Sequence, residues 1–212
     1  MLKHVMRRGA IKPYCGYSLT ELLVARGLAS IVISAVATQA ARSHIAYSSI
    51  QHATSVEDDI RALQSTITQH LSKAGFVYSP NTLSPFGATT IENTVFEVTT
   101  GQRANEPENS CVTFSYDKNK DGVISQAQGE FFGYRLHDNA IEYRVAGHSC
   151  IQSGWYDLTD TQTTVATKFT VNRRHSSSWG SAYEIEIELH SKVDPTVKSA
   201  RTFIVEAVNA YY

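Results

Sequence analysis

Oxygen-bearing residues recur at every second position of one short segment, Asp117–Ser125. They match the first nine positions of an EF-hand-type calcium loop, and the oxygen donors are Asp117, Asn119, Asp121, the Val123 carbonyl and Ser125. Gly122 allows the sharp turn of such a loop. The twelfth position is Gln128, however, in place of the bidentate glutamate. The segment therefore predicts either a Ca²⁺ site or a polar hairpin turn. Calcium is the one cofactor that the sequence suggests.

A second polar segment, Arg173–Gly180, places basic residues beside Trp179. Such side chains can stack on bases or sugars, so DNA binding is one hypothesis, and a solvated hairpin loop is the other. The eight histidines show no metal-ligand spacing, and the sequence contains no glycine-rich phosphate loop or nucleophile elbow. The sequence therefore predicts a protein that is not an enzyme.

A lone carboxylate, Glu21, stands at the head of an apolar run, Leu22–Ala41, that is long enough to cross a membrane as a helix. An ionisable residue in that position is costly unless it is paired. Glu21 is therefore a candidate assembly residue, with solvation by lipid head groups as the alternative. Arg26 lies inside the run. Because Glu21 and Arg26 are five residues apart, they share no helix face, and we hypothesise that Arg26 meets a carboxylate of a neighbouring chain.

The elements that position these residues follow from periodicity. Beyond the apolar run, apolar residues recur at spacings of three and four: Ala46, Ile50, Ala53, Val56, Ile60, Leu63, Ile67, Leu71 and Ala74. Gly75 is a natural helix terminator. The pattern predicts one helix from near Tyr17 to Ala74, with a hydrophobic, transmembrane half over 17–41 and an amphipathic half over 42–75.

Residues 76–212 predict a globular antiparallel β domain. A loop-rich connector over 76–110 contains one strand-like run, Thr94–Thr99. Six more strand-like runs follow: Cys111–Tyr116, Glu130–Leu136, Ala140–Val145, Val165–Val171, Tyr183–Leu189 and Arg201–Val208. Short connections favour antiparallel pairing, and the helix stripe can cover the apolar face of the sheet. The predicted fold class is α+β, with a long N-terminal α-helix packed on an antiparallel β-sheet.

The N-terminal segment resembles the class III signal of type IV prepilins and of the pseudopilins of type II secretion. The resemblance rests on a basic leader, on Gly16 before an aromatic residue, and on Glu21 ahead of the apolar run. It implies that prepilin peptidase removes residues 1–16 by cutting after Gly16, and that Tyr17 becomes the N-methylated mature terminus. It also implies that Glu21 engages the N-terminal amine of a neighbouring subunit. The family usually has Phe where Tyr17 stands, and Arg26 is a larger departure.

A competing interpretation is ordinary signal peptidase, because Ala35–Ala37 is an A-x-A sequence. Cleavage after Ala37 would release a soluble periplasmic binding module. The helical stripe does not stop there, which favours class III processing. Loss of residues 1–16 removes four cations and no acids, so the formal net charge becomes −1 − 4 = −5. An acidic mature chain argues against bulk nucleic-acid binding.

The processed chain would keep two cysteines, Cys111 and Cys150, because Cys15 lies in the leader. An exported chain meets an oxidising periplasm, which favours a disulfide between the two. Two buried free thiols are the alternative.

Looser similarities to W-type minor pilins and J-type minor pseudopilins extend along the body of the chain. They lie at Leu71–Phe76, Tyr116–Asp117 with Asp121–Gly122, Phe132–Leu136 and Trp155–Asp160. The resemblance implies a pilin-like fold and a minor type IV pilin that primes pilus assembly, with a place at the filament tip as a further expectation. A minor pseudopilin of a type II secretion system is the alternative.

The same resemblance implies partners and a location. The partners are other minor and major pilins or pseudopilins, the prepilin peptidase and an inner-membrane assembly platform. Before assembly, the expected location is the inner membrane, as a single-pass protein with a periplasmic globular domain. After assembly, it is the pilus or pseudopilus.

Overall fold

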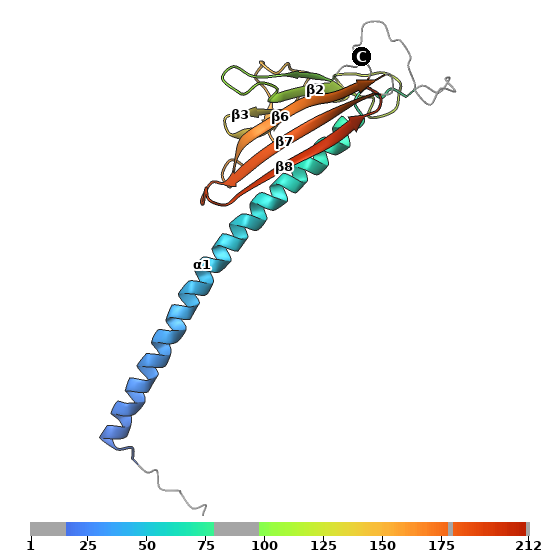
Figure 1. Cartoon of the computed structure of the whole chain (residues 1–212). Coiled ribbons are helices and arrows are strands. Elements are labelled where there is room, and N and C mark those ends of the chain that lie inside the picture. Colours follow the sequence, from blue (N-terminus) through green and yellow to red (C-terminus); the bar gives the residue numbers. More distant parts are fainter. Residues whose placement is uncertain (1–15, 79–97, 178–179, 211–212) are drawn as a thin grey trace, which may run out of the picture. The chain divides into compact units, whose positions relative to one another are not determined.

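The computed structural model describes residues 16–78, 98–177 and 180–210. The chain forms two compact units, Met1–Tyr47 and Ser48–Tyr212, and the long N-terminal helix contributes to both. The described residues form these elements (Figure 1): α1 Leu19–Leu71, β1 Thr99–Gly101, β2 Cys111–Ser115, β3 Phe131–His137, β4 Ala140–Tyr143, β5 Tyr156–Asp157, β6 Thr164–Ser177, β7 Gly180–Ser191 and β8 Lys198–Ala207. Residues 1–15 of the expected leader and residues 94–97 of one expected strand lie outside the described part.

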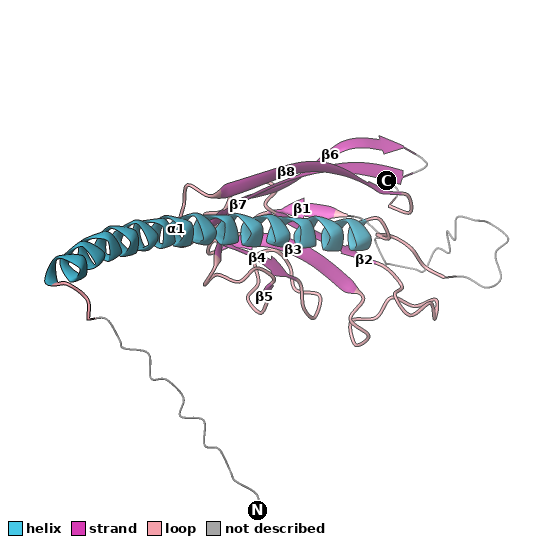
Figure 2. Cartoon of the chain, turned by 90° about the horizontal axis from the view of Figure 1, so that it is seen from below, coloured by secondary structure: helices cyan, strands magenta, loops and turns pink. Residues whose placement is uncertain are grey.

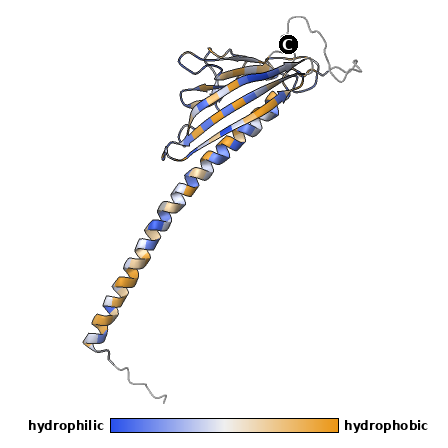
Figure 3. Cartoon of the chain, in the orientation of Figure 1, coloured by the Kyte–Doolittle hydropathy of each residue, from blue (hydrophilic) through white to orange (hydrophobic). Residues whose placement is uncertain are grey.

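The first unit contains the apolar half of α1. The side chains that are described as far as Tyr47 are exposed, and Figure 3 shows hydrophobic residues along this half of the helix. Among the described residues, α1 is the one helix that is long and apolar enough to cross a membrane. Its hydroxyl groups bond back to the helix, as in the 2.7 Å bond from Ser34 Oγ to the Ser30 carbonyl and the 2.8 Å bond from Thr38 Oγ1 to the Ser34 carbonyl. These bonds let the polar residues of the run enter an apolar medium with their donors satisfied.

The second unit contains two antiparallel sheets, which corrects the expectation of a single sheet. One sheet has the strand order β1-β2-β3-β4-β5, and the other has the order β6-β7-β8. Six of the described strands agree in place with the six runs expected from Cys111 onward. Strand β1 shares only Thr99 with the expected run Thr94–Thr99, and β5, of two residues, was not expected. Backbone hydrogen bonds from Ala166 N to the Asn139 carbonyl and from Val171 N to the Asn109 carbonyl link β6 to turns of the first sheet.

The second half of α1 supplies one side of the core, and it lies over strands of both sheets (Figure 2). Its apolar stripe is buried at Val56, Ile60, Leu63, Ile67 and Leu71, and Ala74 is buried in the turn that follows the helix. Earlier members of the predicted stripe remain exposed, including Ile50 and Ala53, so the packed part of the stripe begins at Val56. Burying each large apolar side chain stabilises the fold by about 1.5–3 kcal/mol, before the entropic cost is subtracted.

Strand β7 provides the opposing surface. Tyr183, Ile185, Ile187 and Leu189 are buried, and the alternating glutamates of β7 are only partly buried. This agrees with the alternation in the sequence. Polar contacts also link α1 to β8, because Glu57 accepts hydrogen bonds from Ser199 and Arg201 of β8. Glu57 also accepts a hydrogen bond from Arg61, one turn along the helix. These bonds lower the pKa of Glu57 to about 2, and the bond from Arg61 has the largest effect.

The helix ends at Leu71, three residues before the predicted end. After Leu71, backbone hydrogen bonds join residues three apart instead of four. Lys73 N donates to the His70 carbonyl, and Ala74 N donates to the Leu71 carbonyl. Gly75 has a φ of 79°. A Cβ at Gly75 would lie 2.2 Å from the Asn209 carbonyl oxygen, so the close approach of the C-terminal segment requires glycine there.

Candidate functional site

Ser18 caps the head of α1. Its hydroxyl accepts a 3.3 Å hydrogen bond from Thr20 N, and its carbonyl accepts one from Leu22 N. Glu21 follows in the first turn, where the helix dipole favours a negative charge. Tyr17 is 84% exposed. A Cβ at Gly16 would meet no atom within 4 Å, so packing within the described chain does not require glycine at this position.

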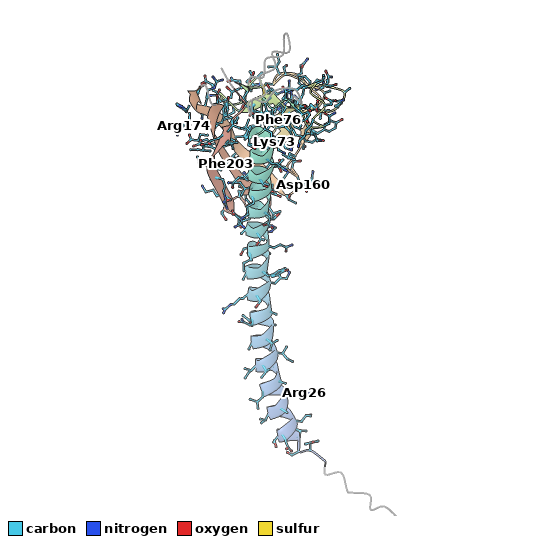
Figure 4. All side chains as sticks on the ribbon, turned by 90° about the vertical axis from the view of Figure 1, so that its right-hand side faces the viewer. Arg26, Lys73, Phe76, Asp160, Arg174 and Phe203 are labelled. Carbon is cyan, nitrogen blue, oxygen red and sulfur yellow. A yellow bond between two sulfur atoms is a disulfide. The ribbon has the colours of Figure 1, made fainter. Side chains whose placement is uncertain are left out.

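Glu21 and Arg26 are both exposed on the apolar half of α1, and Figure 4 shows Arg26 on the outer surface of the helix. At 100° per residue, the two side chains leave the helix about 140° apart. Within the part of the chain that the structure describes, neither has a hydrogen-bond or ion-pair partner. The helix therefore presents one anion and one cation on different sides of its apolar half.

The predicted disulfide is present between Cys111 and Cys150. The two Cα atoms are 6.0 Å apart, and the bridge joins the first residue of β2 to the segment between β4 and β5. Cys111 is fully buried. Gly101 of β1 packs against the bridge, since a Cβ there would lie 3.3 Å from Cys150 Sγ. The bridge thus closes a long loop of the five-stranded sheet.

Replacing Cys111 and Cys150 together by alanine should lower the free energy of unfolding by about 3–4 kcal/mol, because the bridge closes a loop of 39 residues. Denaturant unfolding of the wild type and the double variant, each with and without reductant, measures the effect. Reductant should destabilise the wild type to the level of the variant and leave the variant unchanged. Equal stability of the oxidised wild type and the variant would contradict a stabilising bridge.

The Asp117–Ser125 segment lies in the connection between β2 and β3. Two buried carboxylates accept hydrogen bonds from its backbone. Asp117 is buried, and it accepts hydrogen bonds from the backbone N–H groups of Lys120 at 2.6 Å, Gly122 at 2.8 Å and Tyr78 at 3.0 Å. Glu130, also buried, accepts bonds from Lys118 N at 2.8 Å and Ser125 N at 2.9 Å. The sequence had not identified this capping role of Glu130.

The side chains of two further predicted calcium ligands, Asn119 and Asp121, bond to each other. Asn119 Nδ2 donates a 2.8 Å hydrogen bond to Asp121 Oδ2, and Val123 N donates one of 2.9 Å to Asp121 Oδ1. Across the described residues, no three His, Cys, Asp or Glu side chains are grouped to hold a metal ion. Hydrogen bonds thus account for the order of this turn, and calcium binding stays a prediction. A melt that shifts between calcium and chelator would support it.

The segment expected as a hairpin loop, Arg173–Gly180, is mostly strand, which corrects that expectation. Residues 173–177 extend β6, and β7 begins at Gly180. Arg174 (Figure 4) forms an ion pair with Glu184 of β7, which raises the pKa of the arginine. Trp179 lies outside the described residues. The basic segment is thus partly neutralised by the acidic face of β7.

Sequence reasoning missed an aromatic cluster around His70, at the last turns of α1. The imidazole Nδ1 lies 2.6 Å from the Tyr134 hydroxyl, and the ring centroid lies 5.0 Å from that of Phe132. Burial has the largest effect on the pKa of His70 and lowers it. The positive charges of Lys73 and Lys118 lower this pKa further. A lone histidine on a helix gives no signal of this kind in the sequence, because its partners are distant along the chain.

The lowered pKa of His70 predicts a pH dependence of stability. Just below the ordinary value of 6.5, the unfolded chain binds the proton and the folded chain does not. This contribution to stability should be complete above pH 6.5 and be lost as the pH falls below it. Unfolding at several pH values, with NMR titration of the ring, measures the effect. His70→Gln should reduce the slope, and titration of His70 at or above 6.5 would contradict the prediction.

Comparisons with known proteins agree with this architecture. Residues 49–207, which include all eight described strands, match the family of prepilin peptidase-dependent protein B. A protein of Escherichia coli (strain K12) described as "Prepilin peptidase-dependent protein B" is 21% identical over 198 residues, which are 92% of this chain and 96% of that protein. No solved structure matches the chain. Because the family match covers most of the sequence, the chain belongs to the prepilin peptidase-dependent protein B family.

Proposed function

We propose that this chain is a minor type IV pilin, a non-enzymatic structural subunit that primes pilus assembly and lies at the filament tip. One observation carries the proposal. A single helix, α1, joins an exposed apolar half headed by Glu21 to a second half that is packed into the globular unit. The membership of the prepilin peptidase-dependent family supports a pilus-related role.

The processing step follows from the same helix. Prepilin peptidase cuts after Gly16 and frees Tyr17, which is then methylated. Packing within the described chain does not require glycine at position 16. This supports the proposal that the peptidase requires the glycine. The name of the related Escherichia coli protein, with its dependence on prepilin peptidase, supports the same step.

Assembly is then non-covalent. Before assembly, the apolar half of α1 anchors the chain in the inner membrane as a single span, with the globular unit in the periplasm. The Tyr17 amine of one subunit pairs with the carboxylate at the head of its neighbour, because two charges in an apolar medium recover their desolvation cost only as a pair. The partners are other minor and major pilins on an inner-membrane assembly platform.

A minor pseudopilin of a type II secretion system would use the same physics, and deletion of the gene separates the two functions. We expect loss of surface pili, with unchanged export of secreted enzymes, and restoration of pili by the wild-type gene. Electron microscopy of the cell surface and assays of culture supernatants measure the two outcomes. Loss of secreted enzymes with normal pili would establish the pseudopilin alternative. Normal pili and normal secretion would contradict both.

A further inference from the structure

Three tyrosines form a row across the five-stranded sheet. Tyr134 of β3 lies opposite Tyr143 of β4, which in turn lies opposite Tyr156 of the edge strand β5. Directly opposite residues of antiparallel strands point to the same face. The exposed fractions rise along the row, from 2% for Tyr134 to 40% for Tyr143 and 58% for Tyr156. The row therefore begins under α1 beside His70 and ends in the open at the sheet edge.

A cavity of about 510 Å³ lies over this row. Helix α1 bounds it with Thr66 and His70, β3 bounds it with Phe131 and Phe132, and Leu158 lies at the β5 side. Its size falls within the range of about 300–1,000 Å³ that is usual for small-molecule sites. Tyr143, Tyr156 and Leu158, three of the exposed large apolar residues of the globular unit, all line it. Water is thus in contact with apolar rings that a ligand could cover.

The described lining of the cavity contains one permanently charged side chain. No carboxylate lines it, and Arg144 is its cation. The guanidinium of Arg144 donates to the carbonyls of His148 at 2.6 Å, Gly147 at 2.8 Å and Phe132 at 3.3 Å. His70 is held by the Tyr134 hydroxyl. Three of the five N–H groups of Arg144 are therefore engaged by the wall, and no other described lining residue carries a permanent charge.

Hydroxyl groups remain available, however. Within the described chain, the hydroxyls of Thr66, Tyr143 and Tyr156 have no protein hydrogen-bond partner, although Tyr143 and Tyr156 stack on each other with centroids 5.8 Å apart. A site with several aromatic faces and a few uncharged hydrogen-bonding groups recognises a ligand that combines flat apolar faces with polar edges. A purely hydrocarbon ring would leave these hydroxyls without partners, at a cost in binding.

We propose that the cavity binds a neutral saccharide. A pyranose ring packs its C–H face on Tyr143 and Tyr156, and its hydroxyl groups bond to the phenol groups and to Thr66. The proposal does not depend on the pilin function, because the cavity lies wholly in the globular unit.

The test is a titration of the full chain with two neutral disaccharides, N,N′-diacetylchitobiose and maltose. The chain is held in a zwitterionic detergent without a sugar head group, because maltoside and glucoside detergents would compete. NMR of ring-labelled tyrosine should show saturable shifts of Tyr143 and Tyr156 with at least one disaccharide. Tyr156→Ala should weaken binding about tenfold, the change for loss of one good stacking contact. Tyr156→Phe, which keeps the ring, should cause a smaller loss.

The matched control is Tyr78→Ala, which removes a tyrosine that is 43% exposed outside the cavity and should leave binding unchanged. Unchanged circular dichroism of Tyr156→Phe and Tyr156→Ala shows that folding survives. Failure of both disaccharides to produce a saturable shift overturns the proposal. So does binding that both Tyr156 variants leave intact. Binding of the apolar probe p-cresol without binding of either disaccharide also overturns it and assigns the cavity to an apolar ring.

Discussion

Replacing Arg135 by methionine should lower the free energy of unfolding by about 3–5 kcal/mol, as expected when one member of a buried ion pair is removed. The Arg135 side chain is 1% exposed, and its Nε donates a 2.5 Å hydrogen bond to Oε2 of Glu142, which is itself 10% exposed. Its Nη1 donates 2.7 Å bonds to the carbonyls of Cys150 and Gln152. The guanidinium also lies 4.5 Å from the Trp155 ring centroid.

Methionine occupies a similar volume but leaves Glu142 and the two carbonyls without a donor. Denaturant unfolding of the full chain, followed by tryptophan fluorescence, measures the loss. The matched control is Arg174→Met, whose exposed ion pair with Glu184 is worth about 1 kcal/mol or less. A double variant that also replaces Glu142 by leucine should lose less than the sum of the single variants, because no uncompensated carboxylate remains. Equal stability of Arg135→Met and Arg174→Met would contradict a structural role for the buried pair.

Replacing Glu21 by leucine should reduce incorporation into filaments about 100-fold, while membrane insertion is unchanged or improved. A charge in a membrane helix costs about 2.5–3.5 kcal/mol, and a pairing partner in the assembly returns a similar amount. A loss of that size is about a hundredfold in the docking equilibrium. The ratio of this chain in sheared filaments to that in the membrane fraction measures the effect. Normal incorporation of Glu21→Leu would contradict the docking role.

Arg26→Leu is the matched variant on the same helix. If Arg26 meets a carboxylate of a neighbouring subunit, the substitution should lower incorporation, even though the apolar segment becomes a better membrane span. The absence of a partner for Arg26 among the described residues supports this hypothesis. Incorporation equal to or above that of the wild type would contradict it and would leave Arg26 as a residue that extends to the head groups.

Much of the fold could be predicted from local patterns. The stripe from Val56 to Ala74 specifies the packed face of α1, and the alternation of Tyr183–Leu189 specifies β7, because both periods are written in neighbouring residues. Sequence patterns do not reveal which strands pair, so the division into two sheets was missed. Strand β5 was also missed, because two residues are too few for a periodic pattern.

The site residues likewise divide into those that a local sequence pattern could predict and those that it could not. The Cys111–Cys150 bridge could be predicted, because an exported chain with two cysteines offers one pairing. The roles of Glu130, His70 and Arg135 could not, because each depends on partners from distant segments. The extension of β6 through Arg173 was missed because polar residues on an exposed strand resemble a loop. The ion pair between Arg174 and Glu184 of β7 supports the polar outer face of the strand there.

Mass spectrometry of the mature N-terminus tests the central claim most directly. The chain is isolated from cells that contain prepilin peptidase and from cells that lack it. The account predicts a chain that begins at N-methylated Tyr17 in the first case and keeps residues 1–16 in the second. A mature chain that begins at Thr38 in both cases would contradict the account, because ordinary cleavage after Ala37 would have removed Glu21 and the apolar half of the helix.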